Sequence, residues 1–191
     1  GRSPRGFAGG NGMSAPVPGF SPWWDAPGTV RAFVTLRSGG VSRGPFASFN
    51  LAEGVGDVPE AVRTNRARLR EGLGLPAEPA WLEQAHGADW AVAGPEGPEP
   101  TRADAGVVDS PGGVAAVLTA DCLPVLLARG DGTAAAAVHA GWRGLAAGGI
   151  EAGARALGGE SGLHACMGAA IGPGSYTVGE EVRSAFGEDL P

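Results

Sequence analysis

Three side chains that can bind a transition metal lie beside apolar runs of the sequence. His86 ends a run that begins at Trp81, Cys122 lies just beyond the run 114–119, and His139 ends an alanine-rich run. Strand ends of α/β proteins gather functional groups at one edge of the sheet, so these three side chains can meet there. Two imidazoles and one thiolate would give zinc three protein ligands and leave one position open, which is the catalytic arrangement. The open position would hold an acidified water or polarise a substrate oxygen.

The separation of His86, Cys122 and His139 along the sequence does not by itself establish that they bind one metal ion. The ligands are separated by 36 and then 17 residues, which matches no local zinc-finger spacing. A cysteine near a strand is often a small buried apolar residue, and a histidine beside a glycine often makes a loop hydrogen bond. His164 and Cys166 lack a flanking polar cluster and are not assigned to the site.

Two further positions suggest contacts with an anion or a substrate. Arg143 follows Gly141 at an expected helix start, where backbone N–H groups and the guanidinium favour phosphate or carboxylate. The alternative is that Arg143 pairs with a nearby carboxylate. Asn65 occupies an apolar position of an expected helix stripe, which consists of Val58, Val62, Asn65, Leu69 and Leu73. It either bonds a neighbouring loop or is held toward a cleft.

The elements expected to position these residues alternate between strands and helices. Asp57 as N-cap and Gly74 as terminator predict a helix ending near Leu73. Alternation or apolar runs predict strands at 30–36, 80–85, 106–108, 114–119, 125–128 and 134–139. A second helix is expected over 143–157. The pattern predicts an α/β or α+β protein with a mixed sheet and packed helices.

Composition limits the class of protein. The 191 residues, 43% of them hydrophobic, fit one domain. Residues 1–22 are rich in Gly and Pro and are predicted to be a flexible tail, with Met13 as the natural start and 1–12 as an added extension, before a single domain over 23–191. A net charge of −6 argues against binding to nucleic acid or an anionic membrane. No apolar stretch reaches the length of a membrane span, so a soluble cytoplasmic protein is expected.

Several motifs, read in order, resemble those of one protein family. They are Ser38–Ser42, Ser48–Leu51, Asn65-Arg66, Gln84–Gly87, Ala103–Ala105, Thr119–Pro124, His139–Gly144 and Ile171–Pro173. Together they resemble the YfiH family, also called the laccase-domain or multicopper polyphenol oxidase family, from about Thr35 to Val182. The pair Asp-Cys-x-Pro and His-Ala-Gly-Trp-Arg-Gly is highly specific.

The resemblance implies a site and an activity. It implies that His86, Cys122 and His139 bind zinc, in an α/β layered fold likened to bacterial-toxin cysteine hydrolases. It also implies phosphorolysis of adenosine, inosine and methylthioadenosine, together with adenosine deamination. A purine nucleoside and phosphate are then the expected partners. On this hypothesis Cys122 and His139 act through the metal, Arg143 holds phosphate, and Asn65 and Arg66 orient the ribose or the anion.

Three other functions are weighed beside this one. A laccase-like polyphenol oxidase would need copper, but the chain has only three histidines, too few for several coppers. Copper stays the alternative metal, because two histidines and a cysteine resemble a single blue-copper ligand set, although that set usually carries an axial methionine. A hydrolase would use Cys122 as nucleophile and His139 as its base on peptidoglycan precursors. A non-enzymatic binding domain could retain the metal site.

Family members usually continue beyond Gly172–Gly179 with another helix and closing strands. The end at Pro191 therefore indicates a truncated or partly ordered chain, or a reduced fold.

Overall fold

The computed structural model describes residues 16–96, 101–159 and 162–187, which form two compact units. The first unit comprises the described residues up to Trp23 together with Arg31–Glu78. The second comprises Trp24–Val30 and the described residues from Pro79 onward. Each unit is described by itself. Residues 1–15, most of the expected tail, lie outside the described residues.

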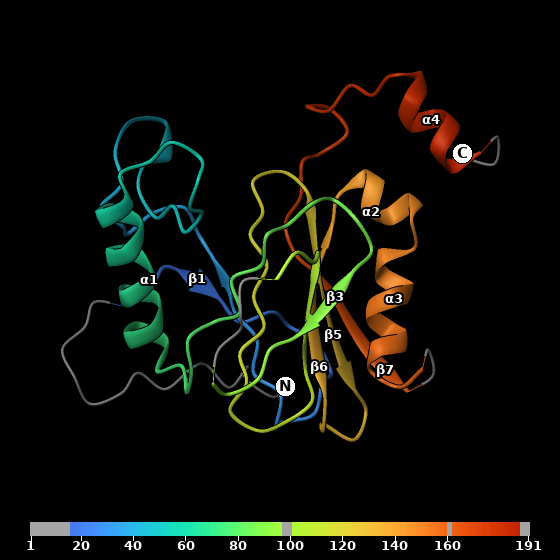
Figure 1. Cartoon of the computed structure of the whole chain (residues 1–191), viewed down its shortest axis with the longest axis horizontal. Helices are drawn as coiled ribbons and strands as arrows, with labels where there is room; N and C mark the ends of the chain where they lie inside the picture. Colours follow the sequence, from blue (N-terminus) through green and yellow to red (C-terminus); the bar gives the residue numbers. More distant parts are fainter. Residues whose placement is uncertain (1–15, 97–100, 160–161, 188–191) are drawn as a thin grey trace. The chain divides into compact units, whose positions relative to one another are not determined.

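The first unit is organised around one helix (Figure 1). Helix α1 spans Pro59–Leu73 and ends at Gly74, whose left-handed φ of 56° suits glycine. It buries Val62, Asn65, Leu69 and Leu73, which confirms most of the predicted stripe. Val58, the first expected member, is instead 59% exposed. The predicted end at Leu73 and Gly74 is confirmed, but the predicted N-cap is wrong: Val58 occupies that position, and the backbone amide that the Asp57 carboxylate accepts is that of Val58 next to it.

Short elements accompany α1 in the first unit. Strand β1 (Gly19–Phe20) pairs antiparallel with β2 (Val34–Thr35), and the 3-10 helix η1 spans Gly44–Phe46. Of the strand predicted at 30–36, only Val34 and Thr35 are paired in a sheet. Strand β1 also lies inside the segment predicted to be a tail.

The second unit contains a five-stranded sheet, and its mixed strand directions confirm the predicted mixed sheet. Its order is β3-β4-β6-β5-β7, with β3 and β4 parallel and the other pairs antiparallel. The strands are β3 (Trp90–Val92), β4 (Ala105–Val108), β5 (Leu123–Arg129), β6 (Ala135–Ala140) and β7 (Leu163–Met167). The helices are α2 (Trp142–Ala146), α3 (Gly149–Ala156) and α4 (Glu180–Phe186). The likeness to cysteine hydrolases stays a prediction.

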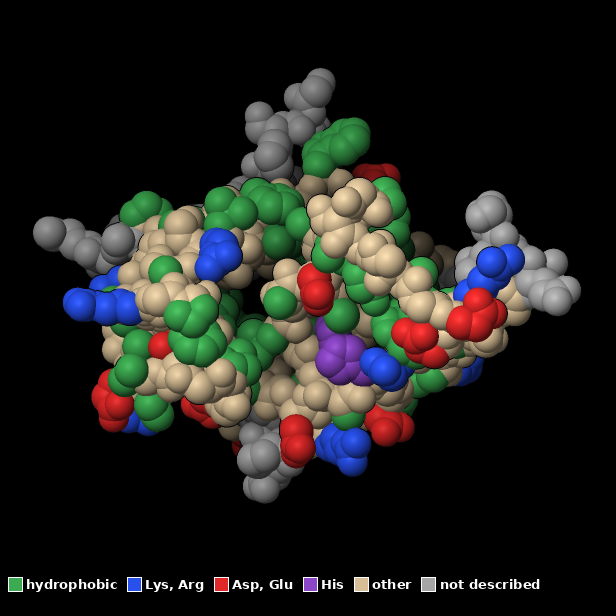
Figure 2. All heavy atoms as spheres, turned by 90° about the horizontal axis from the view of Figure 1, so that it is seen from above, with side chains coloured by type: hydrophobic (Ala, Val, Ile, Leu, Met, Phe, Trp, Pro, Cys, Tyr) green, Lys and Arg blue, Asp and Glu red, His purple; other side chains and the backbone are tan. Residues whose placement is uncertain are grey.

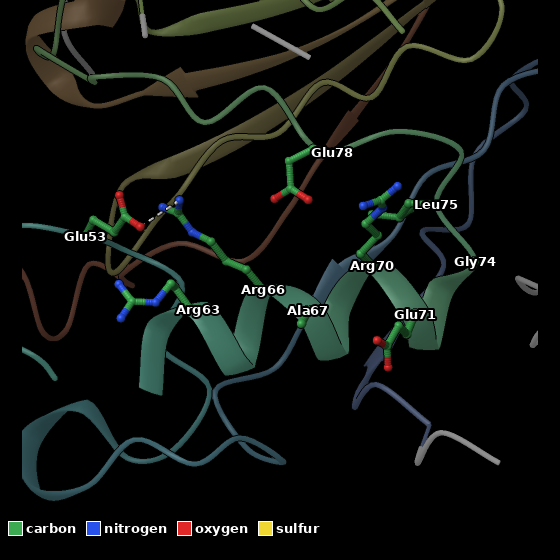
Figure 3. A pocket seen from close by; sticks show the side chains of 9 residues that line it. All are labelled: Glu53, Arg63, Arg66, Ala67, Arg70, Glu71, Gly74, Leu75 and Glu78. Carbon is green, nitrogen blue, oxygen red and sulfur yellow. Dashed lines mark ion pairs between the residues drawn. The ribbon is translucent and has the colours of Figure 1, made fainter. Parts of the chain in front are cut away.

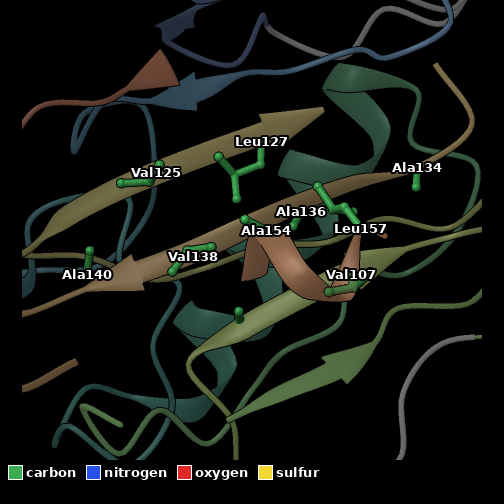
Figure 4. Close-up of a cluster of buried hydrophobic side chains, with 10 residues drawn as sticks. Val107, Val125, Leu127, Ala134, Ala136, Val138, Ala140, Ala154 and Leu157 are labelled. Carbon is green, nitrogen blue, oxygen red and sulfur yellow. The ribbon is translucent and has the colours of Figure 1, made fainter. Parts of the chain in front are cut away.

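The core of this unit lies between the central strands and α3. Figure 4 shows apolar side chains of β4, β5 and β6 gathered around Ala154 and Leu157. A Cβ atom on Gly153 would lie 2.8 Å from Val138, so the glycine allows α3 to approach β6 closely. Full burial of a Val or Leu side chain contributes roughly 1.5–3 kcal/mol, so this cluster makes the central strands a stable platform.

Other sequence predictions differ from the structure. The runs 80–85 and 114–119 form no strands and make only isolated bridges at Ala80–Ala115 and Glu83–Arg102. The helix predicted over 143–157 is broken into α2 and α3, because Gly148 adopts a φ of 78°. Strands β3 and β7 and helix α4 were not predicted. Among the described residues, no helix has the length and apolarity needed to cross a membrane.

Candidate metal centre

The strand pairing brings two of the three predicted ligands together. In the antiparallel pair β5–β6, Pro124 lies opposite His139 and Leu123 lies opposite Ala140. Cys122 directly precedes β5, so its thiol reaches the strand end where His139 lies. His86 reaches the same place from the loop before β3. The candidate ligand atoms of His86, Cys122 and His139 all lie within 4.8 Å of one another.

The chemistry and spacing of these donors fit a zinc ion. Tetrahedral zinc has Zn–S of about 2.3 Å and Zn–N of about 2.0–2.1 Å, which places its ligand atoms roughly 3.5 Å apart. The rings of His86 and His139 meet edge to face, with centroids 4.7 Å apart and an interplanar angle of 76°. Small side-chain rotations would therefore bring the donors to coordination distance.

Burial differs among the three ligands and leaves one side open. His139 is buried, Cys122 is half-buried and His86 is exposed. Figure 2 shows histidine side chains reaching the surface with a basic side chain beside them. Among the described residues, the solvent-facing side of the cluster is therefore the side that carries His86.

Gly141 allows this close approach. A Cβ atom at this position would lie 2.9 Å from Cδ2 of His86 and 3.1 Å from Sγ of Cys122. Both distances are shorter than an ordinary contact of about 3.5–4.0 Å. Gly141 has φ of −68° and ψ of 160°, which any residue adopts, so the lack of a side chain is what the site requires.

Asp104 connects the two histidines. One oxygen, Oδ1, accepts hydrogen bonds from the ring Nδ1 of His139 at 2.8 Å and from the amide of His86 at 2.9 Å. The other oxygen accepts from the amides of Ala85 and Gly87. Burial raises the pKa of Asp104, but the hydrogen bonds from His139 and from these amides outweigh it, and the pKa lies below its ordinary value. Asp104 is therefore an ionised, buried acceptor.

The backbone at His86 has an unusual conformation. Its φ of 59° lies in the left-handed region, which costs a residue with a side chain roughly 1–2 kcal/mol. The three successive amides of residues 85–87 point at the Asp104 carboxylate, as in an anion-binding nest. These hydrogen bonds offset the strain and hold the loop.

Gln84 connects the loop that carries His86 to Leu118, in the segment that precedes Cys122, through two hydrogen bonds. Its side-chain nitrogen donates to the carbonyl of Leu118 at 2.8 Å, and its oxygen accepts from the amide of Leu118 at 2.7 Å. The side chain thus bonds both backbone groups that a neighbouring strand would pair. This explains why the apolar run 114–119 does not need a strand partner at that point.

The protonation of Cys122 bears on its role. Burial raises the pKa of its thiol, and the negative charges of Asp121 and Asp104 raise it further. A nucleophilic cysteine normally has a lowered pKa, because the thiolate is the reactive form. A bound cation would reverse this effect by stabilising the thiolate, so the surroundings suit a metal ligand better than a free nucleophile.

Arg143 is exposed at the start of α2, beside the cluster in sequence. Its guanidinium lies 4.2 Å from the centroid of the Trp142 ring. Within the part of the chain that the structure describes, no ion pair to Arg143 is formed, so the alternative of a carboxylate partner is not observed. Helix α2 has only five residues, so an anion would depend mainly on the side chain.

Asn65 belongs to the first unit and has its polar atoms engaged there. Its oxygen accepts from the amide of Val41. Its nitrogen donates to the hydroxyl of Ser42 and to the carbonyls of Ser48 and Asn50. The side chain is fully buried, so the structure agrees with the first alternative from the sequence, in which Asn65 hydrogen-bonds a neighbouring loop. A role in orienting substrate stays a prediction.

Arg66 also belongs to the first unit. Its Nε donates to the carbonyl of Leu51, and its guanidinium pairs with Glu53 at 3.3 Å, as drawn in Figure 3. Burial lowers the pKa of Arg66, while Glu53 and Glu78 raise it. The surrounding pocket of about 520 Å³ is lined by three arginines and three glutamates, so its charges balance. The predicted contact of Arg66 with substrate stays untested.

Sequence reasoning missed three contributors to the centre: Asp104, Gln84 and Gly141. Each lies in a motif noted for its resemblance, but none has a type and spacing that indicate metal chemistry. The sequence did contain one signal for Asp104. It lies between two alanines directly before an apolar run, and a carboxylate that is buried in such a place needs hydrogen-bond partners.

Comparison with known proteins identifies the family. A profile described as multi-copper polyphenol oxidoreductase laccase matches residues 31–191. The chain belongs to this family. The resemblance inferred from the motifs is thereby confirmed.

Curated relatives in this family have names that refer to nucleosides. A Pseudomonas aeruginosa protein named purine nucleoside phosphorylase is 50% identical over 169 residues, covering 87% of this chain and 68% of the relative. The Escherichia coli purine nucleoside phosphorylase YfiH is 46% identical over 166 residues, covering 86% of this chain and 68% of the relative.

Solved structures support the same assignment. A crystal structure of a Neisseria meningitidis protein of the DUF152 family superposes with a TM-score of 0.82 at 42% identity, over 88% of this chain and 69% of that one. YlmD from Geobacillus stearothermophilus gives a TM-score of 0.75 at 31% identity, over 84% of this chain and 67% of that one.

Proposed function

We propose that this chain is a zinc-dependent purine nucleoside phosphorylase that acts on adenosine, inosine or methylthioadenosine, with adenosine deamination as a second activity. The observation that carries the proposal is the convergence of His86, Cys122 and His139 within 4.8 Å, with one side open. The names of relatives at 46–50% identity support the reaction class. The proposal includes the assignment of His86, Cys122 and His139 as the metal ligands and of zinc as the metal.

Phosphorolysis requires an anion, a nucleoside and a stabilised leaving base. An oxygen of phosphate forms a bond to the anomeric carbon while the glycosidic bond breaks, and the purine leaves with the bonding electron pair and takes up a proton. Holding both reactants in line supplies much of the rate. When bound, zinc would polarise a substrate oxygen or activate a water, the latter serving deamination.

The chain's own residues have defined tasks in this scheme. Arg143 binds phosphate oxygens through its planar guanidinium, which is exposed and free of a carboxylate partner among the described residues. His139, buried against the sheet, fixes the inner side of the site, and Cys122 supplies the sulfur ligand. Exposed His86 completes the cluster on the solvent side.

Two rival functions are weakened by particular observations. The raised pKa of Cys122 disfavours a nucleophilic hydrolase. Three histidines in the whole chain are too few for a cluster of coppers that reduces dioxygen to water. Elemental analysis separates all three functions, because it distinguishes zinc, copper and the absence of metal.

The test combines elemental analysis with a phosphate-dependent assay on a panel of purine nucleosides. We expect about one zinc per chain in the unmodified protein, and neither zinc nor activity in His139→Ala. The expected loss of turnover is at least about 1,000-fold, since a Lewis acid contributes several kcal/mol. His164→Ala is the matched control, because His164 lies on β7 outside the cluster. Full turnover by metal-free His139→Ala would refute the proposal.

Deamination is measured separately. Ammonia release from adenosine in phosphate-free buffer should depend on the same metal and should be lost in His139→Ala. Release of ammonia that persists after complete removal of the metal would exclude the water-activation scheme for this second activity.

A further inference from the structure

We propose that Asp104 is a positioning residue of the metal centre: it selects Nε2 of His139 as the ligand atom and holds the loop that presents His86. The inference rests on the metal-binding part of the proposed function. It concerns how tightly the ion is held, and it does not depend on which nucleoside is the substrate.

The first half of the argument concerns the His139 ring. Both His139 and Asp104 are buried, with 4% and 2% of their surfaces exposed. Nδ1 lies 2.8 Å from the carboxylate oxygen Oδ1, so Nδ1 carries the proton and donates it to this hydrogen bond. The lone pair on Nε2 is then available to a metal. A carboxylate behind a ligating histidine fixes its tautomer and ring orientation.

The second half concerns the backbone of His86. Asp104 accepts the amides of Ala85, His86 and Gly87 at 3.0, 2.9 and 2.7 Å. These three hydrogen bonds hold His86 at its φ of 59°, which is costly for a residue with a side chain and persists only when its surroundings stabilise it. The direction of the His86 side chain depends on this backbone.

One oxygen atom couples the two ligands. Oδ1 accepts from the His139 ring and from the His86 amide, so a displacement of this atom moves both donors. The carboxylate offers about four acceptor sites, and four N–H donors fill them. An asparagine would place an NH₂ group against two N–H donors in either orientation. The substitution Asp104→Asn therefore conserves size while disturbing both histidines.

The experiment measures zinc affinity by competition with a chromophoric chelator, at fixed pH, on the folded metal-free chain. For Asp104→Asn we expect affinity to fall 10–100-fold, the usual effect of losing such a partner. Asp131→Asn is the matched control, because Asp131 also accepts a backbone amide in a turn, from Thr133, but touches no ligand. Its zinc affinity should stay within twofold.

Urea unfolding of the metal-free proteins separates positioning from stability. A purely structural role would lower the unfolding midpoint of Asp104→Asn and leave the zinc affinity of its folded fraction unchanged. Unchanged affinity would overturn the inference, even if the variant is less stable.

A second measurement needs no variant and stands even if Asp104→Asn does not fold. Long-range ¹H–¹⁵N spectra of the zinc-loaded unmodified chain should show His139 protonated at Nδ1 and metal-bound at Nε2. Zinc bound through Nδ1 would overturn the inference. Normal zinc binding without phosphorolysis would overturn the proposed reaction alone, whereas no zinc binding in the unmodified chain would overturn both.

Discussion

Gly141→Ala tests whether the ligands depend on a position without a side chain. The new Cβ atom would lie 2.9 Å from Cδ2 of His86 and 3.1 Å from Sγ of Cys122. To restore an ordinary contact of at least about 3.5 Å, the His86 ring must move by about 0.6 Å. Metal–ligand distances tolerate only about 0.2 Å, so the displaced His86 ring would have to bind a metal in a strained position.

The magnitude follows from that displacement. We expect zinc affinity to fall about 10–100-fold, which is about 1.4–2.8 kcal/mol, and turnover to fall about 100-fold. The stability of the metal-free chain should change by less than about 1 kcal/mol, because His86 is exposed and its ring can rotate away.

The assay is a zinc titration of Gly141→Ala beside Gly94→Ala, followed by urea unfolding of both metal-free proteins. Gly94 is the matched control, because a Cβ atom there meets nothing within 4 Å. Wild-type zinc affinity in Gly141→Ala would show that the reasoning from close packing is wrong. An equally large loss of zinc affinity in Gly94→Ala would also show that this reasoning is wrong.

Two further predictions concern the first unit. Asn65→Ala removes the partners of buried groups in the loop that precedes α1 and should lower the free energy of unfolding by about 2–4 kcal/mol, measured by denaturant titration. Thr64→Ala, the control on the exposed face, should change it by less than about 0.5 kcal/mol, and equal effects would contradict the packing argument. Hydrogen bonds from Asn50 and Ser42 lower the pKa of Asp57. Its stabilising contribution is therefore complete above about pH 4 and is lost as the pH falls through the lower folded-state pKa. On acidification, the free energy of unfolding of Asp57→Asn should therefore fall less than that of the unmodified chain. An equally steep fall below about pH 4 in both proteins would refute this assignment.

Local signals in the sequence predicted local structure well. Helix α1 was predicted because its apolar stripe and its glycine terminator lie within one segment of chain, although the cap is Val58 and not Asp57. The run 114–119 was misjudged because its backbone pairs with the Gln84 side chain, a contact 34 residues away that no periodicity reveals. Strand β3 has only three residues, and both β3 and β7 lie at the edges of the sheet, where a strand need not be apolar on both faces, so neither shows the continuous apolar run of the central strands.

The site was predicted in part for the same reason. The three ligand types could be recognised, but their convergence depends on the β5–β6 register and on the left-handed turn at His86. Asp104 was missed because its importance comes from four donors on two separate segments. A residue that acts through its partners becomes visible only when the fold is known.

The β5–β6 pairing has a consequence for how the three donors are placed. Cys122 and His139 are presented by neighbouring ends of two central strands, whereas His86 is presented by a loop. The sheet therefore places two of the three donors through a single strand register, whereas the third depends on the hydrogen bonds between Asp104 and the loop. A change that shifts this register would displace Cys122 and His139 together, and a change confined to the loop would displace His86 alone.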